Sequence, residues 1–224
     1  MAAKNDNYET PRYLADWAVG YAKKQLHLVS EVGPSILEPG CGAKAPFACA
    51  GLVEGCPSIT AIENRKVFKG DKYTPFDDFA EEFCASKDIN FYEEKDFLNL
   101  ESWWGGRKFD IIAANPPFSK ALPFIWKSLD LLQPHGVMIY LLRLSFLSSK
   151  QRMPLYAERP PAEVHILQRR PSFSYDGKTD MSEYAFYVWF GEERMKYKEA
   201  YGYTNTALKW LDNGTLEKEW NSAP

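Results

Sequence analysis

Short apolar runs alternate with stretches of helical periodicity along most of this chain. Apolar runs of about four to eight residues bounded by turn residues are typical of buried strands, and apolar residues spaced three or four apart are typical of helices. The predicted strands are residues 35–38, 58–62, 89–92, 109–114, 137–142, 163–167 and 183–190. The predicted helices are residues 10–21, 43–50, 76–85, 121–132, 149–158 and 204–211.

Strands that alternate with helices predict an α/β fold built on a parallel sheet. The chain has 224 residues and shows no repeat or linker, so we expect a single domain. Within it we expect a loose segment at 1–9, a core at 10–190 and an extension at 191–224.

The fourth predicted strand ends abruptly at Asn115-Pro116-Pro117-Phe118. Ligands of parallel α/β sheets bind at the carboxyl ends of strands, and two prolines make this turn stiff and remove two backbone donors. The Asn115 side-chain oxygen and the Pro116 carbonyl are two acceptors for the hydrogens of an exocyclic amino group, while Phe118 stacks on the ring that carries it. Asn-Pro and Pro-Pro are also common turn dipeptides, so a plain strand-to-helix turn is the alternative interpretation.

Such a turn suits chemistry on an amino nitrogen. An exocyclic amino group is a poor nucleophile because its lone pair is delocalised into the attached ring. Hydrogen bonds to two fixed acceptors favour a pyramidal nitrogen with a localised lone pair, and a rigid turn provides them without reorganising during the reaction.

A glycine-rich turn follows the first predicted strand, in the sequence Glu38-Pro39-Gly40-Cys41-Gly42. Glycines let the backbone approach a ligand where a side chain would collide, and the first turn of the next helix has free N–H groups. The third glycine of a dinucleotide fingerprint and the lysine-serine pair of a phosphate-binding loop are both absent from the sequence. Glu38 therefore favours a cationic ligand group over a phosphate.

Acidic residues follow the next two predicted strands. Glu63 ends the second strand about 20 residues after the glycines, a position that favours hydrogen bonds to both hydroxyls of a ribose over a surface role. Asp96 and Phe97 follow the third strand, where the carboxylate is placed to accept from an adenine amino group and the ring to line the base. A solvated acid beside a core aromatic is an equal alternative for that pair.

Charge and cysteine content narrow the class of protein. The formal net charge is −3, so no overall basic field indicates a nucleic-acid partner. Residues 143–178 nevertheless carry seven bases against three acids, and the loop at 168–180 mixes bases with aromatics, which favours a nucleic-acid substrate over an ordinary hairpin loop. Without a membrane-length apolar run or a signal-peptide pattern, we expect a cytoplasmic protein. No metal site is expected, because paired metal spacing is absent from the four cysteines, Cys41, Cys49, Cys56 and Cys84.

The order of these motifs resembles that of Rossmann-like S-adenosylmethionine-dependent methyltransferases, in particular those that modify the exocyclic N6 of adenine. The resemblance covers about residues 10–190 and is carried by the glycine turn, Glu63, Asp96-Phe97 and Asn-Pro-Pro-Phe. It implies a seven-stranded, mostly parallel sheet with helices on both faces and a C-terminal antiparallel hairpin. Residues 170–185 are also similar to small methyltransferases of phages and prophages.

The resemblance implies a role for each motif. The catalytic turn is expected to be Asn115, Pro116, Pro117 and Phe118. The cofactor, S-adenosyl-L-methionine, is expected to contact Thr10, Pro11, Tyr13, Glu38, Gly40, Cys41, Gly42, Glu63, Asp96, Phe97 and Asn115. The target base and its strand are expected to contact Phe118, Arg169, Arg170, Phe173, Tyr175 and Lys178.

The implied reaction is methyl transfer to N6 of adenine in DNA, with the base flipped out of its stack. We expect no separate target-recognition domain, so recognition would be loop-based, supplied by a second protomer, or nearly absent. Three alternatives stay open. They are an RNA adenine methyltransferase, a protein glutamine methyltransferase, which Phe118 in place of the usual tyrosine disfavours, and a non-catalytic cofactor-binding subunit. We expect a monomer or homodimer in a bacterial or phage-infected host cell.

Overall fold

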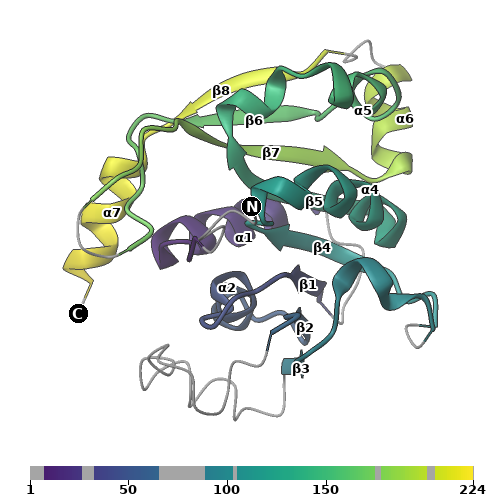
Figure 1. The fold of residues 1–224 in the computed structure, drawn as a ribbon, viewed down its shortest axis with the longest axis horizontal. Coiled ribbons are helices and arrows are strands. Elements are labelled where there is room, and N and C mark those ends of the chain that lie inside the picture. The colour runs from purple at the N-terminus through teal and green to yellow at the C-terminus, as the bar shows by residue number, and fades with distance from the viewer. Residues whose placement is uncertain are drawn as a thin grey trace.

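A twisted β-sheet forms the centre of the protein (Figure 1). The computed structural model describes residues 8–26, 33–65, 89–102, 105–174, 178–200 and 205–223. Within these residues the sheet has eight strands in the order β3-β2-β1-β4-β5-β7-β6-β8. The strands are β1 Ser35–Pro39, β2 Ser58–Ile62, β3 Ile89–Tyr92, β4 Phe109–Ala114, β5 Leu132–Arg143, β6 Glu163–Leu167, β7 Tyr184–Phe190 and β8 Ala207–Leu211.

One strand of the sheet, β7, runs opposite to the other seven. Strands β1 to β5 pair in parallel, β7 lies antiparallel between β5 and β6, and β8 pairs in parallel with β6. The predicted α/β fold with a mostly parallel sheet and an antiparallel pair at residues 163–190 is therefore confirmed.

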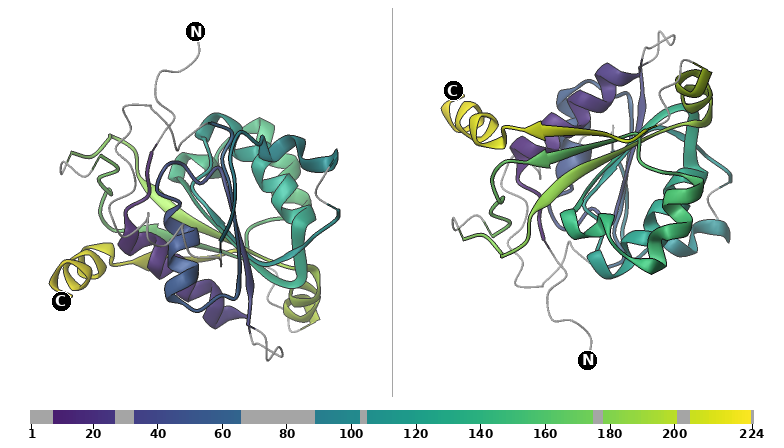
Figure 2. Two further views of the ribbon diagram at one scale, coloured as in Figure 1. Left: turned by 90° about the horizontal axis from the view of Figure 1, so that it is seen from below. Right: turned by 90° about the horizontal axis from the view of Figure 1, so that it is seen from above.

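Helices cover both faces of the sheet (Figure 2). Alternate strand residues point to opposite faces, so one set packs against α1 and α2 and the other against α4, α5 and η1. The helices are α1 Arg12–Gln25, α2 Pro46–Val53, α4 Ala121–Leu131, α5 Met153–Glu158, α6 Glu192–Ala200 and α7 Asn213–Ser222. The 3₁₀ turns are η1 Phe97–Ser102, η2 Phe118–Lys120, η3 Leu144–Leu147 and η4 Lys150–Arg152.

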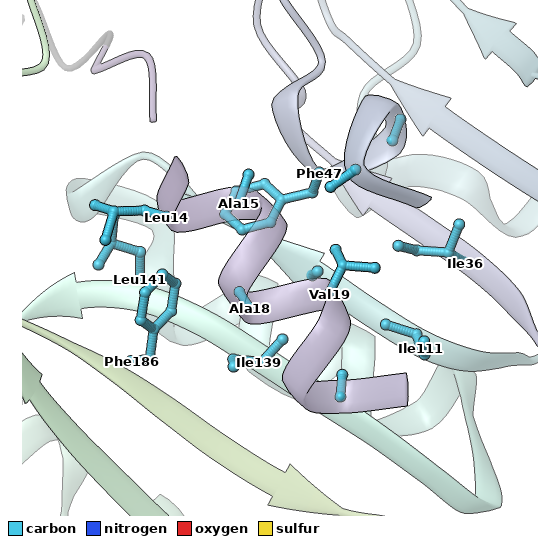
Figure 3. Close-up of a cluster of buried hydrophobic side chains, with 14 of the residues drawn as sticks. Leu14, Ala15, Ala18, Val19, Ile36, Phe47, Ile111, Ile139, Leu141 and Phe186 are labelled. Atoms are coloured by element: carbon cyan, nitrogen blue, oxygen red, sulfur yellow. The ribbon is translucent and has the colours of Figure 1, made fainter. Parts of the chain in front are cut away.

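The buried side of α1 consists of small and branched residues. Leu14, Ala15, Ala18 and Val19 recur at helical spacing and are fully buried. In Figure 3 this side lies over the central strands, close to Ile36, Ile111, Ile139, Leu141 and Phe186. Alanines bring the helix close to the sheet, and this packing holds the residues that precede α1 near the carboxyl ends of the strands.

One predicted element is wrong, and it changes the strand count. Residues 207–211 were predicted as part of a helix but form β8, an eighth strand beyond the seven expected. The pattern of Leu208, Lys209 and Trp210 fits a strand, because Lys209 points to the α1 face while its two neighbours are exposed on the other. Pairing with β6 decides the conformation, and no local propensity signals a partner so distant in sequence. The predicted helix at 76–85 lies outside the described residues.

A buried ion cluster joins α1 to the far end of the sheet. The Glu163 carboxylate on β6 accepts hydrogen bonds from Tyr21 on α1, from His165 Nε2 at 2.9 Å and from Lys209 Nζ on β8 at 2.9 Å. Burial raises the pKa of Glu163, but these three partners outweigh burial and lower that pKa to about 2. The cluster therefore links the edge strand β8 to β6 and to α1.

We expect the substitution Glu163→Gln to lower the free energy of unfolding by about 2 kcal/mol at pH 7. Because the folded-state pKa of about 2 lies below the ordinary value of 4.5, the stabilisation is complete above pH 4.5 and is lost as pH falls toward 2. Urea unfolding of both proteins at pH 7, 5 and 3 measures the difference. A difference that stays constant over this range would show that ionised Glu163 is not its source.

Candidate cofactor and substrate site

A cavity of about 350 Å³ lies at the carboxyl ends of β1, β2 and β4. Parallel α/β sheets bind ligands at this edge. The sequence-predicted residues that line the cavity are Thr10, Glu38, Gly40, Cys41, Gly42, Glu63, Asp96, Phe97, Asn115 and Pro117. The fold thus brings together motifs that are more than a hundred residues apart in the chain.

Glu38, on β1, is fully enclosed beneath the start of α2. Its Oε2 accepts a hydrogen bond from the Ala48 amide at 2.7 Å, one of the N–H groups that the first helical turn leaves without an intrahelical partner. Burial is the largest influence on this carboxyl and raises its pKa well above 4.5, although the amides of Phe47 and Ala48 oppose that shift. A buried carboxyl of this kind becomes more acidic when a cation binds beside it.

The two glycines between β1 and α2 adopt the left-handed conformation. Gly40 has φ +67° and Gly42 has φ +66°, and residues other than glycine rarely adopt these backbone angles. The amides of Gly40 and Cys41 both donate to the Ile62 carbonyl, at 2.7 and 3.0 Å, so the turn is fixed to the end of β2. A Cβ at Gly42 would have no atom within 4 Å, and this open space belongs to the cavity.

Glu63 is a buried carboxylate with fixed orientation. Its Oε2 accepts from the Gly42 amide at 2.8 Å, and its Oε1 accepts from the Arg65 amide at 3.1 Å and from Arg65 Nε at 2.8 Å. A carboxylate has about four lone-pair sites, so Oε2 retains capacity for one further donor from the cavity, whereas Oε1 can accept a ligand donor only in place of one of its two bonds from Arg65. The predicted ribose-binding role stays a prediction, but the position and burial it requires are present.

Asp96 and Phe97 have structural roles and also line the cavity, and their predicted contact with adenine stays a prediction. Asp96 accepts from the Leu98 amide at 3.0 Å and from Asn99 Nδ2 at 3.2 Å, so it stabilises the start of η1. Phe97 is only 2% exposed and packs against Phe124 of α4. Both residues also line the cavity, so structural roles and contact with a ligand are compatible here.

The Asn115 side-chain amide uses its nitrogen in a hydrogen bond, but its oxygen accepts none. Its Nδ2 donates to the Tyr8 carbonyl at 2.8 Å, which identifies the nitrogen side of the amide because a carbonyl only accepts. Its Oδ1 is buried and has no hydrogen-bond partner within the described part of the chain. Buried polar atoms are nearly always hydrogen-bonded, so this oxygen is the expected place for a ligand donor.

Phe118 and Pro116 do not line the cavity themselves, but the Phe118 ring contacts Tyr8, which does. The Phe118 ring centroid is 5.3 Å from that of Tyr8 and 5.8 Å from that of Tyr184. The Arg143 guanidinium lies over the Phe118 ring, 4.4 Å from its centroid. Tyr8 and Arg143 were not among the predicted site residues, because one lies in the segment expected to be loose and the other at the end of an apolar strand.

Several predicted site residues do not line this cavity. Tyr13 is buried in the core, with its hydroxyl hydrogen-bonded to Asn213 of α7, and Pro11 precedes α1 as its N-cap instead of Thr10. Arg169, Arg170 and Lys178 are exposed side chains. Arg170 forms an ion pair with Glu183 at 2.6 Å. Phe173 is buried beside Tyr8, and Tyr175 lies outside the described residues.

The described part of the chain contains neither a metal-binding cluster nor a membrane-spanning helix. Among those residues there is no group of three or more metal-binding side chains. The same residues include no helix that is both long and apolar enough to cross a membrane.

Comparison with known proteins identifies the fold. No protein-family model matches the sequence, and the search of curated proteins found no match. A structure from Listeria monocytogenes, provisionally described as a class I S-adenosylmethionine-dependent methyltransferase, has a TM-score of 0.66 at 11% identity, covering 94% of this chain and 68% of that chain. The type I restriction-modification methyltransferase subunit of Streptococcus thermophilus has a TM-score of 0.66 at 14% identity, covering 96% of this chain and 52% of that chain.

A third similar structure comes from Pyrococcus horikoshii and is provisionally described as an RNA methyltransferase. Its TM-score is 0.56 at 12% identity, covering 85% of this chain and 92% of that chain. This chain spans about half the length of the restriction-modification subunit and nearly the full length of the Pyrococcus protein. At these identities the likeness establishes the fold alone: the chain has the fold of class I S-adenosylmethionine-dependent methyltransferases.

Proposed function

We propose that this protein binds S-adenosylmethionine and transfers its methyl group to the exocyclic N6 of adenine in DNA. The observation that carries the proposal is the buried, unpartnered Oδ1 of Asn115 in a stiff Pro-Pro turn beside the cavity. An amino group on a planar base would supply the missing donor, and the Pro116 carbonyl is the expected second acceptor.

The residues of the cavity suit the proposed cofactor. S-adenosylmethionine has a sulfonium that carries an activated methyl, an ammonium, a ribose and an adenine. Glu38 would balance the positive charge, and Glu63 would accept from the ribose hydroxyls. The open space at Gly42 would let the ligand lie close to the backbone of the glycine turn. Asp96 would accept from the adenine amino group. No phosphate is required, which agrees with the two buried carboxyl groups of the lining, Glu38 and Glu63.

The turn then performs its part of the reaction through alignment. Asn115 Oδ1 and the Pro116 carbonyl would draw the two amino hydrogens away from the ring plane and leave the lone pair directed at the methyl group. Holding the two reacting groups in line removes much of the entropic barrier. The methylated nitrogen is acidic and releases its proton to water, so no general base is needed.

A nucleic-acid substrate is supported by the surroundings of the site. The segment that carries exposed Arg169 and Arg170 continues to Phe173, whose ring contacts Tyr8 at 5.1 Å. Basic side chains close to aromatic side chains are characteristic of proteins that bind single-stranded nucleic acid. Extrusion of a base from a duplex costs a few kcal/mol, and stacking against aromatics at about 1–3 kcal/mol per base is large enough to offset it.

Transfer of labelled methyl from S-adenosylmethionine to duplex DNA, single-stranded DNA and structured RNA tests the proposal. We expect label in the adenine of DNA and none after Asn115→Ala. Label in neither nucleic acid, from protein that binds the cofactor, would refute the proposed substrate class and favour a protein amide or a non-catalytic subunit.

An RNA substrate is the second candidate, and one observation favours it. The Pyrococcus protein provisionally described as an RNA methyltransferase is covered almost completely by this chain, whereas the restriction-modification subunit contains about as much chain again. A compact protein of this kind suits a structured RNA. Label that appears in RNA but not in DNA would select this candidate and leave the chemistry of the turn unchanged.

Cofactor binding is expected to depend on the ionisation of Glu38. Because a bound cation favours the carboxylate, affinity for S-adenosylmethionine should increase as pH rises through the elevated pKa of Glu38 in the free protein. The substitution Glu38→Gln should abolish this pH dependence and weaken binding about tenfold or more at pH 8. Isothermal titration calorimetry from pH 6 to 9 measures both effects.

The substitution Glu38→Gln should weaken cofactor binding but increase the folding stability of the cofactor-free protein. Because burial raises the pKa of Glu38 in the folded protein, folding favours the protonated carboxyl. Its contribution to the free energy of unfolding is fully present below the pKa of the unfolded chain and is lost as pH rises through the pKa of the folded protein. Glu38→Gln should therefore stabilise the cofactor-free protein at pH 8. A variant that loses both stability and affinity would indicate that Glu38 is purely structural.

A further inference from the structure

Tyr8 has two separate connections to the proposed catalytic turn. Its backbone carbonyl accepts from Asn115 Nδ2 at 2.8 Å, and this bond orients the amide so that Oδ1 stays available. Its ring lies 5.3 Å from the Phe118 ring at an interplanar angle of 44°. Tyr8 is half-buried and lines the cavity together with Asn115.

Phe173, one of the residues expected to contact the target base, packs against Tyr8. Phe173 is 9% exposed, and its ring makes edge contacts with Tyr8 at 5.1 Å and Tyr184 at 4.9 Å. Of these aromatic side chains Tyr8 lines the cavity, whereas Phe173 and Phe118 do not. A base that stacks on Phe118 would therefore meet Tyr8 before it meets Phe173.

The Arg143 guanidinium marks a place for a planar group beside these two rings. It lies 4.4 Å from the Phe118 centroid and 6.0 Å from the Tyr8 centroid. Its side chain is hydrogen-bonded to Tyr184 and its Nη2 lies 3.8 Å from the Asp180 carboxylate, but its buried Nε has no hydrogen-bond partner in the described structure. A planar cation in this position stacks on aromatic faces much as a nucleobase does.

We infer that Tyr8 is the second wall of the target-base subsite. The adenine enters between the Phe118 and Tyr8 rings, which contact each other directly without it, and displaces the Arg143 guanidinium that lies beside them. Its amino group then reaches Asn115 Oδ1. Two stacked contacts need about 7 Å between the walls, so the Tyr8 ring moves outward when the base enters. Tyr8 precedes the first residue of α1, so this movement does not require the helix to shift. The inference rests on the proposed function and specifies the substrate end of the same site.

The test compares Tyr8→Leu with Tyr8→Phe, and uses Trp210→Leu, which removes an exposed aromatic of β8 remote from the site, as the matched control. Loss of one stacking wall should raise KM for single-stranded DNA about 10- to 100-fold in Tyr8→Leu. Tyr8→Phe keeps the ring and should stay within about threefold of the unsubstituted protein, and kcat at saturating DNA should fall less than KM rises. The cofactor dissociation constant and the thermal midpoint report on folding.

Each outcome has a distinct meaning. Transfer by the unsubstituted protein with an unchanged KM in Tyr8→Leu overturns the inference alone, as does an equal loss in Tyr8→Phe. No transfer by the unsubstituted protein overturns the proposed function, and the inference with it. If Tyr8→Leu fails to fold, photocrosslinking of the unsubstituted protein to DNA carrying 5-iodouracil in place of the target adenine decides. Attachment at Tyr8 supports the inference, and attachment at Phe173 without Tyr8 overturns it.

Discussion

Replacing Asn115 by alanine is expected to lower kcat for methyl transfer by about 100- to 1,000-fold, the usual effect of removing one preorganised polar group from an active site. The substitution removes the acceptor Oδ1 and also the hydrogen bond to the Tyr8 carbonyl. Steady-state kinetics with labelled S-adenosylmethionine and an adenine-containing oligonucleotide measure the change. The cofactor dissociation constant should stay within about threefold, because the lost interaction is made mainly as the amino nitrogen reacts.

The control for this experiment is Asn221→Ala, which removes an exposed amide on α7. It should leave kcat unchanged. An Asn115→Ala protein that retains normal kcat would show that the Pro-Pro turn is an ordinary connection between strand and helix. It would contradict the proposed role of Asn115 Oδ1 in holding the amino group.

The second large effect is expected at Glu63. Its carboxylate is 3% exposed and points toward the cavity while bound to the Gly42 amide. A hydrogen bond from a ribose hydroxyl to a charged acceptor contributes about 1.5–3 kcal/mol, and the second hydroxyl would replace an Arg65 bond at Oε1. Glu63→Gln should therefore weaken cofactor binding by about 10- to 100-fold. Calorimetric titration with S-adenosylmethionine, and separately with S-adenosylhomocysteine, measures the loss.

The two ligands distinguish a ribose contact from a charge effect. Both carry the same ribose, but S-adenosylhomocysteine lacks the sulfonium charge, so a ribose contact predicts equal losses for the two. A loss confined to S-adenosylmethionine would assign Glu63 to charge balance instead. Glu158→Gln, on the exposed side of α5, is the matched control and should bind both ligands normally.

The strands and the glycine turn were predictable because their signals are local. Apolar runs at 58–62, 89–92 and 109–114 coincide with β2, β3 and β4, and a strand buried on both faces needs little context to form. The left-handed conformations at Gly40 and Gly42 follow from the same local reasoning. Because parallel strands end at one edge of the sheet, the gathering of Glu38, Glu63 and Asn115 could also be anticipated.

The features that were missed depend on contacts between distant parts of the chain. Tyr8 belongs to the segment expected to be loose, but its position is set by Asn115, 107 residues later. Strand β8 depends on pairing with β6 and on the Glu163–Lys209 ion pair. Tyr13 has the spacing of the core residues of α1, and it does lie in that core instead of at the cofactor cavity.

The central claim is that the amino group held by Asn115 and Pro116 receives the methyl group. The most direct measurement is to digest nucleic acid methylated by the protein and identify the labelled nucleoside by chromatography and mass spectrometry. We expect the label in N6-methyldeoxyadenosine, and we expect no labelled nucleoside when the Asn115→Ala variant is used. Label on a ring carbon of any base, or on a protein, would contradict it.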